Sequence, residues 1–116
     1  MAVRLKSGIY VSALIRRCEA AGVQAFLVRR GAEEAGAIFI KVSRLDGTCY
    51  VLSPAQRVML SEDEVAGRAW TRPLGERADD AQARDYFARQ MKFDPDIWIV
   101  EIEDREGRAF VDEPIV

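Results

Sequence analysis

The chain has 116 residues, which is enough for one domain and too few for two, because an independent core usually needs about 100 residues or more. Hydrophobic residues make up 49% of it and charged residues 31%, which excludes a disordered chain and a fibrous repeat. The lack of histidine also excludes catalytic triads built on a histidine base and most zinc sites. We expect a single globular domain over residues 1–116.

The first half of the chain predicts one helix and three strands. Apolar residues recur every three or four positions over 7–21, which predicts an amphipathic helix with Ser7 as its cap and Gly22 as its stop. β-Branched and aromatic residues predict strands at 24–30, 37–43 and 48–53. Asp46 and Gly47 form a strong hairpin signal, so the second and third strands should be antiparallel neighbours.

The second half predicts a loop region, a helix and one or two strands. Residues 54–78 carry proline, glycine and charge with weak periodicity, so we expect a loop with a short strand near 68–72. Two acids at 79 and 80 precede apolar residues at helical spacing and predict a helix that stops before Phe93. Residues 97–103 predict a strand with alternate core and solvent positions, and a short edge strand at 108–111 follows after a turn.

Together these elements predict a two-layer α+β domain. Short links between neighbouring strands favour a mainly antiparallel meander sheet with both helices packed on one face. The other face of the sheet should then be solvated or covered by a second copy of the chain. Trp70 or Trp98 could anchor a partner if it is exposed.

The net charge of −2 hides an uneven distribution along the chain. Residues 1–57 hold nine basic and four acidic residues, whereas residues 58–116 hold eight basic and fifteen acidic ones. The two halves can neutralise each other within the fold, attract a second copy, or present a basic face to an anionic partner. Mutual neutralisation is the favoured interpretation of the three.

The cysteines and the start of the chain bear on its compartment. Cys18 and Cys49 are too few for a four-cysteine metal cluster and too far apart for a redox pair, so we expect both to be buried apolar groups. The start of the chain lacks the pattern of a secretory signal, and no stretch approaches the ~18 apolar residues of a membrane span. We therefore expect a protein of the reducing cytoplasm with no membrane contact.

The segment 29–36 combines arginines, glycines and glutamates in the connection between two predicted strands. In a functional interpretation, the arginines would hold a carboxylate or phosphate, and a glutamate would serve as a metal ligand or a base. The alternative, a hairpin connection whose charged tip keeps it soluble, is favoured because charged hairpin tips are common. The candidate ligand-binding residues, in this segment and on the strand after it, are Arg29, Arg30, Glu33, Glu34 and Lys41.

Two further charged features of the sequence are candidate binding sites. The acids between Asp94 and Asp104 could in principle bind Mg²⁺ or Ca²⁺, but their spacing matches no calcium loop and is typical of a turn and a solvated strand. The basic first half carries no recognised RNA-binding signature, and a sequence pI near 5.2 disfavours nonspecific binding to nucleic acid.

In three segments the chain resembles a family of short alphaproteobacterial proteins known as domain of unknown function 1491. These segments are RLKSGIYVSALIRRCEAAG at 4–22, RRGAEEAGAIFIKVSRLDG at 29–47 and FDPDIWIVEIEDREGR at 93–108. The resemblance covers most of the chain except 54–78. It implies a stand-alone cytoplasmic bacterial protein of one domain, with no activity, cofactor or catalytic residue to transfer to this sequence.

The sequence therefore favours a small cytoplasmic bacterial protein that is not an enzyme and that works by association, as an adapter or a homodimer. The alternative is a small anionic-ligand or metal-dependent site at the 29–36 hairpin, and RNA binding through the basic N-terminal half is the weaker one. We expect self-association, leave open a protein partner or a small anionic ligand, and expect neither a cofactor nor a catalytic residue.

Overall fold

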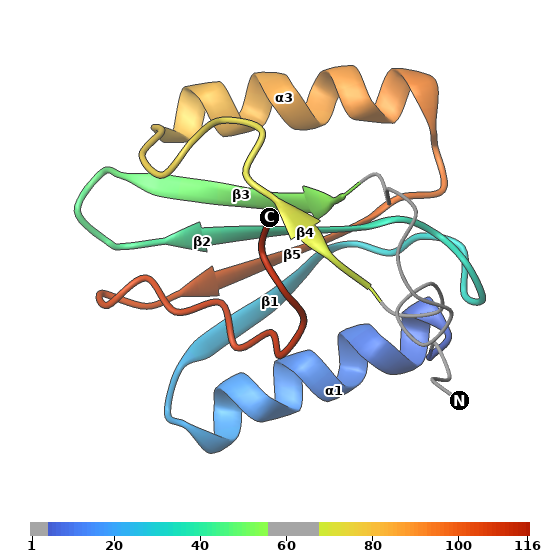
Figure 1. Cartoon of the computed structure of the whole chain (residues 1–116), viewed down its shortest axis with the longest axis horizontal. Coiled ribbons are helices and arrows are strands. Elements are labelled where there is room, and N and C mark those ends of the chain that lie inside the picture. Colours follow the sequence, from blue (N-terminus) through green and yellow to red (C-terminus); the bar gives the residue numbers. More distant parts are fainter. Residues whose placement is uncertain (1–4, 56–67) are drawn as a thin grey trace.

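The computed structural model describes residues 5–55 and 68–116. Two helices and a five-stranded sheet make up these parts of the chain (Figure 1), which confirms an α+β fold. The predicted 54–78 region lies partly outside the described residues. In chain order the elements are α1 (Ser7–Ala20), β1 (Gln24–Arg29), β2 (Ile38–Ser43), β3 (Cys49–Pro54), β4 (Trp70–Thr71), α3 (Asp80–Phe93) and β5 (Trp98–Glu103).

The strand order of the sheet is β1-β5-β2-β3-β4, so the predicted meander is wrong. β5 lies between β1 and β2 and runs parallel to β2, whereas the β1–β5, β2–β3 and β3–β4 pairs are antiparallel. The sheet is thus mainly antiparallel, as expected, but the last strand of the chain lies inside it. The apolar run from Ile97 to Val100 is buried whichever face its residues point to, which is typical of an internal strand.

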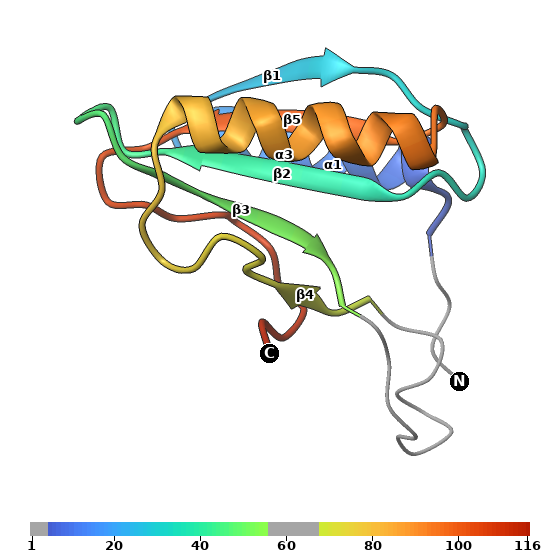
Figure 2. The same cartoon turned by 90° about the horizontal axis from the view of Figure 1, so that it is seen from above.

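The helices pack on opposite faces of the sheet, so the expectation that both cover one face is wrong. Residues of α1 form one core cluster with Ile40 and Val42, whereas α3 packs against Phe39 and Ile99, which point the other way. Figure 2 shows α3 in front of the sheet and α1 behind it. The physical reason lies in β2 and β3, where successive residues are apolar, so both faces of these strands need a cover.

Local backbone chemistry fixes one end of each helix. α1 ends at Ala20 and Gly22 is its stop, as predicted: Gly22 has φ +76°, and its N–H and that of the next residue donate to carbonyls of the last helical turn. α3 begins with a capping box, in which the Asp79 carboxylate accepts from the Gln82 N–H and the Gln82 side chain accepts from the Asp79 N–H. The helix continues to Phe93, slightly further than predicted.

The predicted hairpin between β2 and β3 is confirmed. Gly47 has φ +88°, and the Asp46 carboxylate accepts hydrogen bonds from the Thr48 N–H (2.9 Å) and hydroxyl (2.6 Å). The short strand expected near 68–72 is also present as β4, which pairs with the end of β3.

The end of the chain crosses the α1 side of the sheet. Ala109 is buried in the α1-side core, and Phe110 has φ +60°, a left-handed conformation that interrupts a strand. The edge strand predicted at 108–111 is therefore wrong.

Both tryptophans are core residues. Each is 1% exposed, so neither Trp70 nor Trp98 anchors a partner at the surface. The Trp70 backbone N–H donates to the Pro114 carbonyl (2.9 Å), and its carbonyl accepts from the Val116 N–H (2.7 Å), which fastens the C-terminal segment to β4. The Trp70 indole N–H donates to Glu113 (3.2 Å).

Charged pairs join the two halves of the sequence inside the fold. Arg17 pairs with Asp112 at 3.1 Å and Lys41 with Asp80 at 2.9 Å, as the neutralisation interpretation predicts. Both cysteines are free and fully buried, as expected, and burial raises the pKa of each thiol. Within residues 5–55 and 68–116, neither helix has the length and apolar character that a membrane span requires.

Candidate functional site

The segment 29–36 connects β1 to β2 and passes the end of β5, which separates these two strands. It is therefore not a hairpin, and that part of the prediction is wrong. The segment instead holds the start of α1: the N–H groups of Ser7 and Gly8 donate to the carbonyls of Glu34 (3.1 Å) and Glu33 (3.0 Å). These bonds satisfy amide donors that a helix leaves free at its first turn.

Ser7 does not cap α1 with its side chain, contrary to the prediction. The residue at the cap position is Lys6, which makes no side-chain cap bond, and the Ser7 hydroxyl donates to the Gly36 carbonyl at 2.6 Å. Ser7 is 1% exposed, so this hydroxyl is a buried link between α1 and the 29–36 segment. The helix is capped by the backbone of a distant segment, and the residue next to the cap fixes that segment in place.

Gly31 and Gly36 are required by close backbone approach. A Cβ atom on Gly31 would overlap the Asp96 carbonyl oxygen and lie 2.6 Å from the Ile97 carbonyl carbon, and one on Gly36 would lie 2.5 Å from the same oxygen. The Ala32 N–H donates to that oxygen at 2.9 Å. The two glycines therefore permit the segment to pack on the 96–98 backbone, and a ligand is not needed to explain them.

The two candidate arginines contact the segment that leads into β5 and the first residue of that strand. The Arg29 guanidinium donates to the Pro95 carbonyl at 2.6 Å, and the Arg30 guanidinium lies 5.5 Å from the centre of the Trp98 ring. The Trp98 indole N–H donates to the Ala32 carbonyl at 2.7 Å. Arg29 thus binds the turn at 93–96 to the end of β1, and Arg30 contacts the start of β5 although it stays exposed to solvent.

The candidate glutamates lie at the start of α1. The Glu33 side chain packs over Gly8, so closely that a Cβ on that glycine would overlap its carboxylate. This position places a negative charge at the positive end of the helix dipole. Glu34 forms an exposed pair with Lys6 at 3.7 Å, which contributes little to stability because both side chains are largely solvated.

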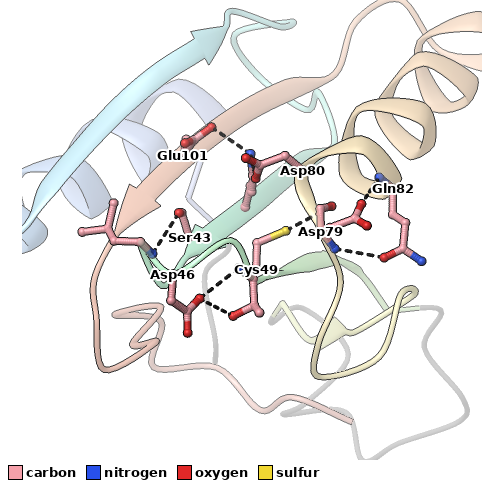
Figure 3. Close-up of polar contacts among 10 residues, drawn as sticks. Ser43, Asp46, Cys49, Asp79, Asp80, Gln82 and Glu101 are labelled. Atoms are coloured by element: carbon pink, nitrogen blue, oxygen red, sulfur yellow. Dashed lines mark hydrogen bonds and ion pairs between the residues drawn. The ribbon is translucent and has the colours of Figure 1, made fainter.

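Lys41 lies apart from the other four candidates, on the sheet face that α3 covers. Its ammonium contacts the carboxylates of Asp80 (2.9 Å) and Glu101 (3.6 Å), and its side chain is only 14% exposed. Figure 3 shows these two carboxylates together with the capping contacts of Asp79 and Gln82. Burial alone would lower the pKa of Lys41, but the hydrogen bond to Asp80 and the charges of both carboxylates outweigh it and raise that pKa.

These contacts give each predicted site residue a structural role. Arg29, Arg30, Glu33 and Glu34 surround one packed segment, and Lys41 joins α3 to the sheet. In the described residues, no three His, Cys, Asp or Glu side chains are close enough together to hold a metal ion. Ligand binding by the five candidates is not required by these contacts and stays a prediction.

Sequence reasoning missed a more exposed feature, the outer edge of the sheet at β1. Phe26, Leu27 and Val28 are 46%, 39% and 57% exposed, although they are consecutive in a strand. The register of β1 against β5 shifts between Leu27 and Arg29, a bulge at Val28. The available signal was the run QAFLVRR, in which the apolar residues do not alternate with polar ones as they do in a half-buried strand.

The described residues thus define a small α+β protein, with one helix on each face of a mixed sheet and a polar segment that caps the first helix. The chain belongs to the family described as protein of unknown function (DUF1491), whose model matches residues 5–112. The resemblance of the three sequence segments is therefore confirmed.

Three solved structures similar to this chain agree with this fold. A DUF1491 family protein from Caulobacter crescentus CB15 is 40% identical in its crystal structure, with a TM-score of 0.82 over 97% of this chain and 99% of that one. The NMR structure of a DUF1491 family protein from the same organism is 39% identical, with a TM-score of 0.81 over 99% of both chains. Protein Atu0922 from A. tumefaciens is 36% identical, with a TM-score of 0.78 over 98% of this chain and 100% of that one. A search of curated proteins finds no match.

Proposed function

We propose that this protein is a non-enzymatic association module of the cytoplasm and that it forms a homodimer through the free edge of β1. The observation that carries the proposal is the row of three exposed apolar side chains, Phe26 to Val28, on a strand that pairs on one side only within residues 5–55 and 68–116. A strand edge of this kind offers unpaired backbone groups to another chain, and exposed apolar side chains add burial to that pairing.

A second copy is the occupant that the charges around β1 favour. Twofold antiparallel pairing brings the Arg29 and Arg30 end of one β1 beside the Gln24 end of the other. At that end, Gln24 is paired with Glu103 of β5. A shallow groove of about 360 Å³ opens there, lined by Glu19, Gly22, Val23, Gln24, Ala25 and Phe26. The exposed Arg30 of one copy is therefore brought toward the groove that Glu19 of the other copy lines.

Sedimentation velocity and light scattering at micromolar concentration test the proposal. The wild-type protein should be a dimer that weakens as salt rises, because salt screens the arginine–carboxylate contacts. Val28→Lys should give a folded monomer, since a lysine on a free edge opposes strand pairing. The matched control is Ile9→Lys, which places the same charge on an apolar residue of similar exposure, 51%, on α1; it should stay dimeric.

Circular dichroism distinguishes dissociation from unfolding in each variant. A second edge variant, Phe26→Lys, places a lysine beside Glu101 and should behave like Val28→Lys. A wild-type protein that stays monomeric across this concentration range would refute the proposal. So would equal dissociation of the Val28 and Ile9 variants, because the contact would then not depend on β1.

A further inference from the structure

Arg44 and Arg72 lie against the same aromatic ring at the other side of the sheet from β1. Their guanidinium carbons are 5.1 Å and 4.9 Å from the centre of the Tyr50 ring, and Tyr50 is 3% exposed. The two guanidinium carbons are therefore at most about 10 Å apart, which is the sum of their distances to the centre of the Tyr50 ring. Arg44 follows β2 and Arg72 follows β4, so only the fold brings them together.

The Tyr50 ring that both arginines contact is held firmly. The Tyr50 hydroxyl donates to the Gly107 carbonyl at 2.6 Å, and a Cβ atom on Gly107 would lie 3.1 Å from Arg44 Nε. Arg44 Nη2 donates to the Glu76 carbonyl at 2.9 Å. The Arg44 guanidinium is thus oriented before any ligand arrives, and Arg72 lies against the same fixed ring, which reduces the entropy lost on binding.

The positive charge at this point has no carboxylate partner among the described residues. The ion pairs of residues 5–55 and 68–116 involve other cations, namely Lys6, Arg17, Lys41 and Arg108. Asp104 is close enough to affect Tyr50, but its carboxylate already accepts two hydrogen bonds from the Arg108 guanidinium, at 2.9 and 3.0 Å.

Hydrogen-bond donors at the same place are also unsatisfied. Arg44 Nη1 and Arg72 Nε are buried and have no acceptor within the described parts of the chain. Both side chains remain half-exposed as a whole, so other edges of their guanidinium groups can be reached from solvent. A ligand with several oxygens would accept hydrogen bonds from these reachable edges and would neutralise two charges that are partly removed from water.

We propose that Arg44 and Arg72 form a binding site for a phosphate group, either free or carried by a small molecule. Phosphate fits because its charge at pH 7, between −1 and −2, matches two cations better than one carboxylate does, and because guanidinium forks bind its oxygens in pairs. This site is independent of the proposed dimer, since β5 and β2 separate β1 from β3.

Thermal unfolding in sodium phosphate and in sodium chloride of equal ionic strength tests the site. At a phosphate concentration ten times the dissociation constant, the unfolding equilibrium constant should fall about 11-fold relative to chloride. Arg44→Gln and Arg72→Gln should abolish this difference. Arg89→Gln, which removes the same charge from an exposed position on α3, should keep it. A comparison of inorganic phosphate with glycerol phosphate shows which source the site prefers.

The wild-type protein provides a test that does not depend on how the variants fold. In NMR spectra, the Nε–H signals of Arg44 and Arg72 should shift with phosphate and saturate, while that of Arg89 should not. An equal shift of all three signals, no shift at all, or a phosphate effect that survives in both glutamine variants would overturn the proposal.

Discussion

Replacement of Gly31 by alanine tests the close packing of the 29–36 segment on the 96–98 backbone. The added Cβ meets the Asp96 carbonyl oxygen and the Ile97 carbonyl carbon, which are backbone atoms and cannot rotate away. The two segments must therefore separate, and the bonds from Ala32 N–H to Asp96 (2.9 Å) and from the Trp98 indole to Ala32 (2.7 Å) lengthen or break.

The expected loss of stability follows from these two bonds. Each contributes about 1 kcal/mol net, and a buried indole N–H that loses its acceptor adds a desolvation cost of about 1–3 kcal/mol. We expect Gly31→Ala to lower the free energy of unfolding by about 3–5 kcal/mol, a large part of the ~5–15 kcal/mol of a typical domain. Urea unfolding followed by circular dichroism measures this difference.

Gly75→Ala is the control for the general cost of replacing a glycine. Gly75 has φ +76° and open space around it, so this variant has left-handed backbone strain of about 1–2 kcal/mol and no clash. Hydrogen exchange of the Trp98 indole N–H separates the two effects, because only Gly31→Ala should accelerate it. A Gly31→Ala protein within about 1 kcal/mol of wild type, with a protected indole, would refute the packing argument.

Four further predictions concern single side chains. Asp79→Ala removes the capping box of α3 and should lower the free energy of unfolding by about 1 kcal/mol in the same urea assay. Tyr10→Phe removes the 2.6 Å hydrogen bond to Glu113 and should lower the free energy of unfolding by a similar amount. Burial raises the pKa of Tyr10, so an absorbance titration of the wild type should show ionisation of this tyrosine only when the protein unfolds, above pH 10. The hydrogen bonds from Arg108 hold the pKa of Asp104 below its ordinary value. This pair therefore contributes its full stability above the pKa that Asp104 has in the unfolded chain, and the contribution is lost as pH falls through the lower pKa of the folded protein. Asp104→Asn should make the urea midpoint of unfolding depend less on pH below pH 4. If the 29–36 segment binds a small anion, divalent metals, nucleotides or dicarboxylates should raise the melting temperature and Arg30→Ala should abolish the rise, whereas no response from the wild type would leave only the structural role.

The sequence was sufficient to predict the elements because their signals are local. The spacing of Val11, Leu14 and Cys18 defines the buried side of α1, and Gly22 ends the helix with the positive φ that the residue permits. Asp46 and Gly47 similarly define the β2–β3 hairpin. Each of these features depends on residues that are close together in the sequence, so it can be predicted without knowledge of the tertiary fold.

The arrangement of the elements was harder to predict because it depends on contacts between distant segments. The sequence of each strand does not indicate that β5 pairs with both β1 and β2, because the choice of a pairing partner depends on two segments and not on one. One signal for the opposite helices was available. β2 has apolar residues at Ile38, Phe39 and Ile40 in succession, and a strand that is apolar on both faces requires a cover on each.

The two arginine clusters show why a site cannot be inferred from a local pattern. Arg29 and Arg30 attract attention because they are adjacent in the sequence and flanked by glycine, yet the fold gives them a carbonyl and a tryptophan ring to contact. Arg44 and Arg72 are separated by 28 positions and match no motif, yet they share one buried ring and have no carboxylate partner in the described residues. The capacity to bind an anion depends on how much of a cation's charge the protein has already neutralised. Among the described residues neither pair has a carboxylate partner, so what distinguishes Arg44 and Arg72 is the buried Tyr50 ring that they share, a contact that only the tertiary fold creates.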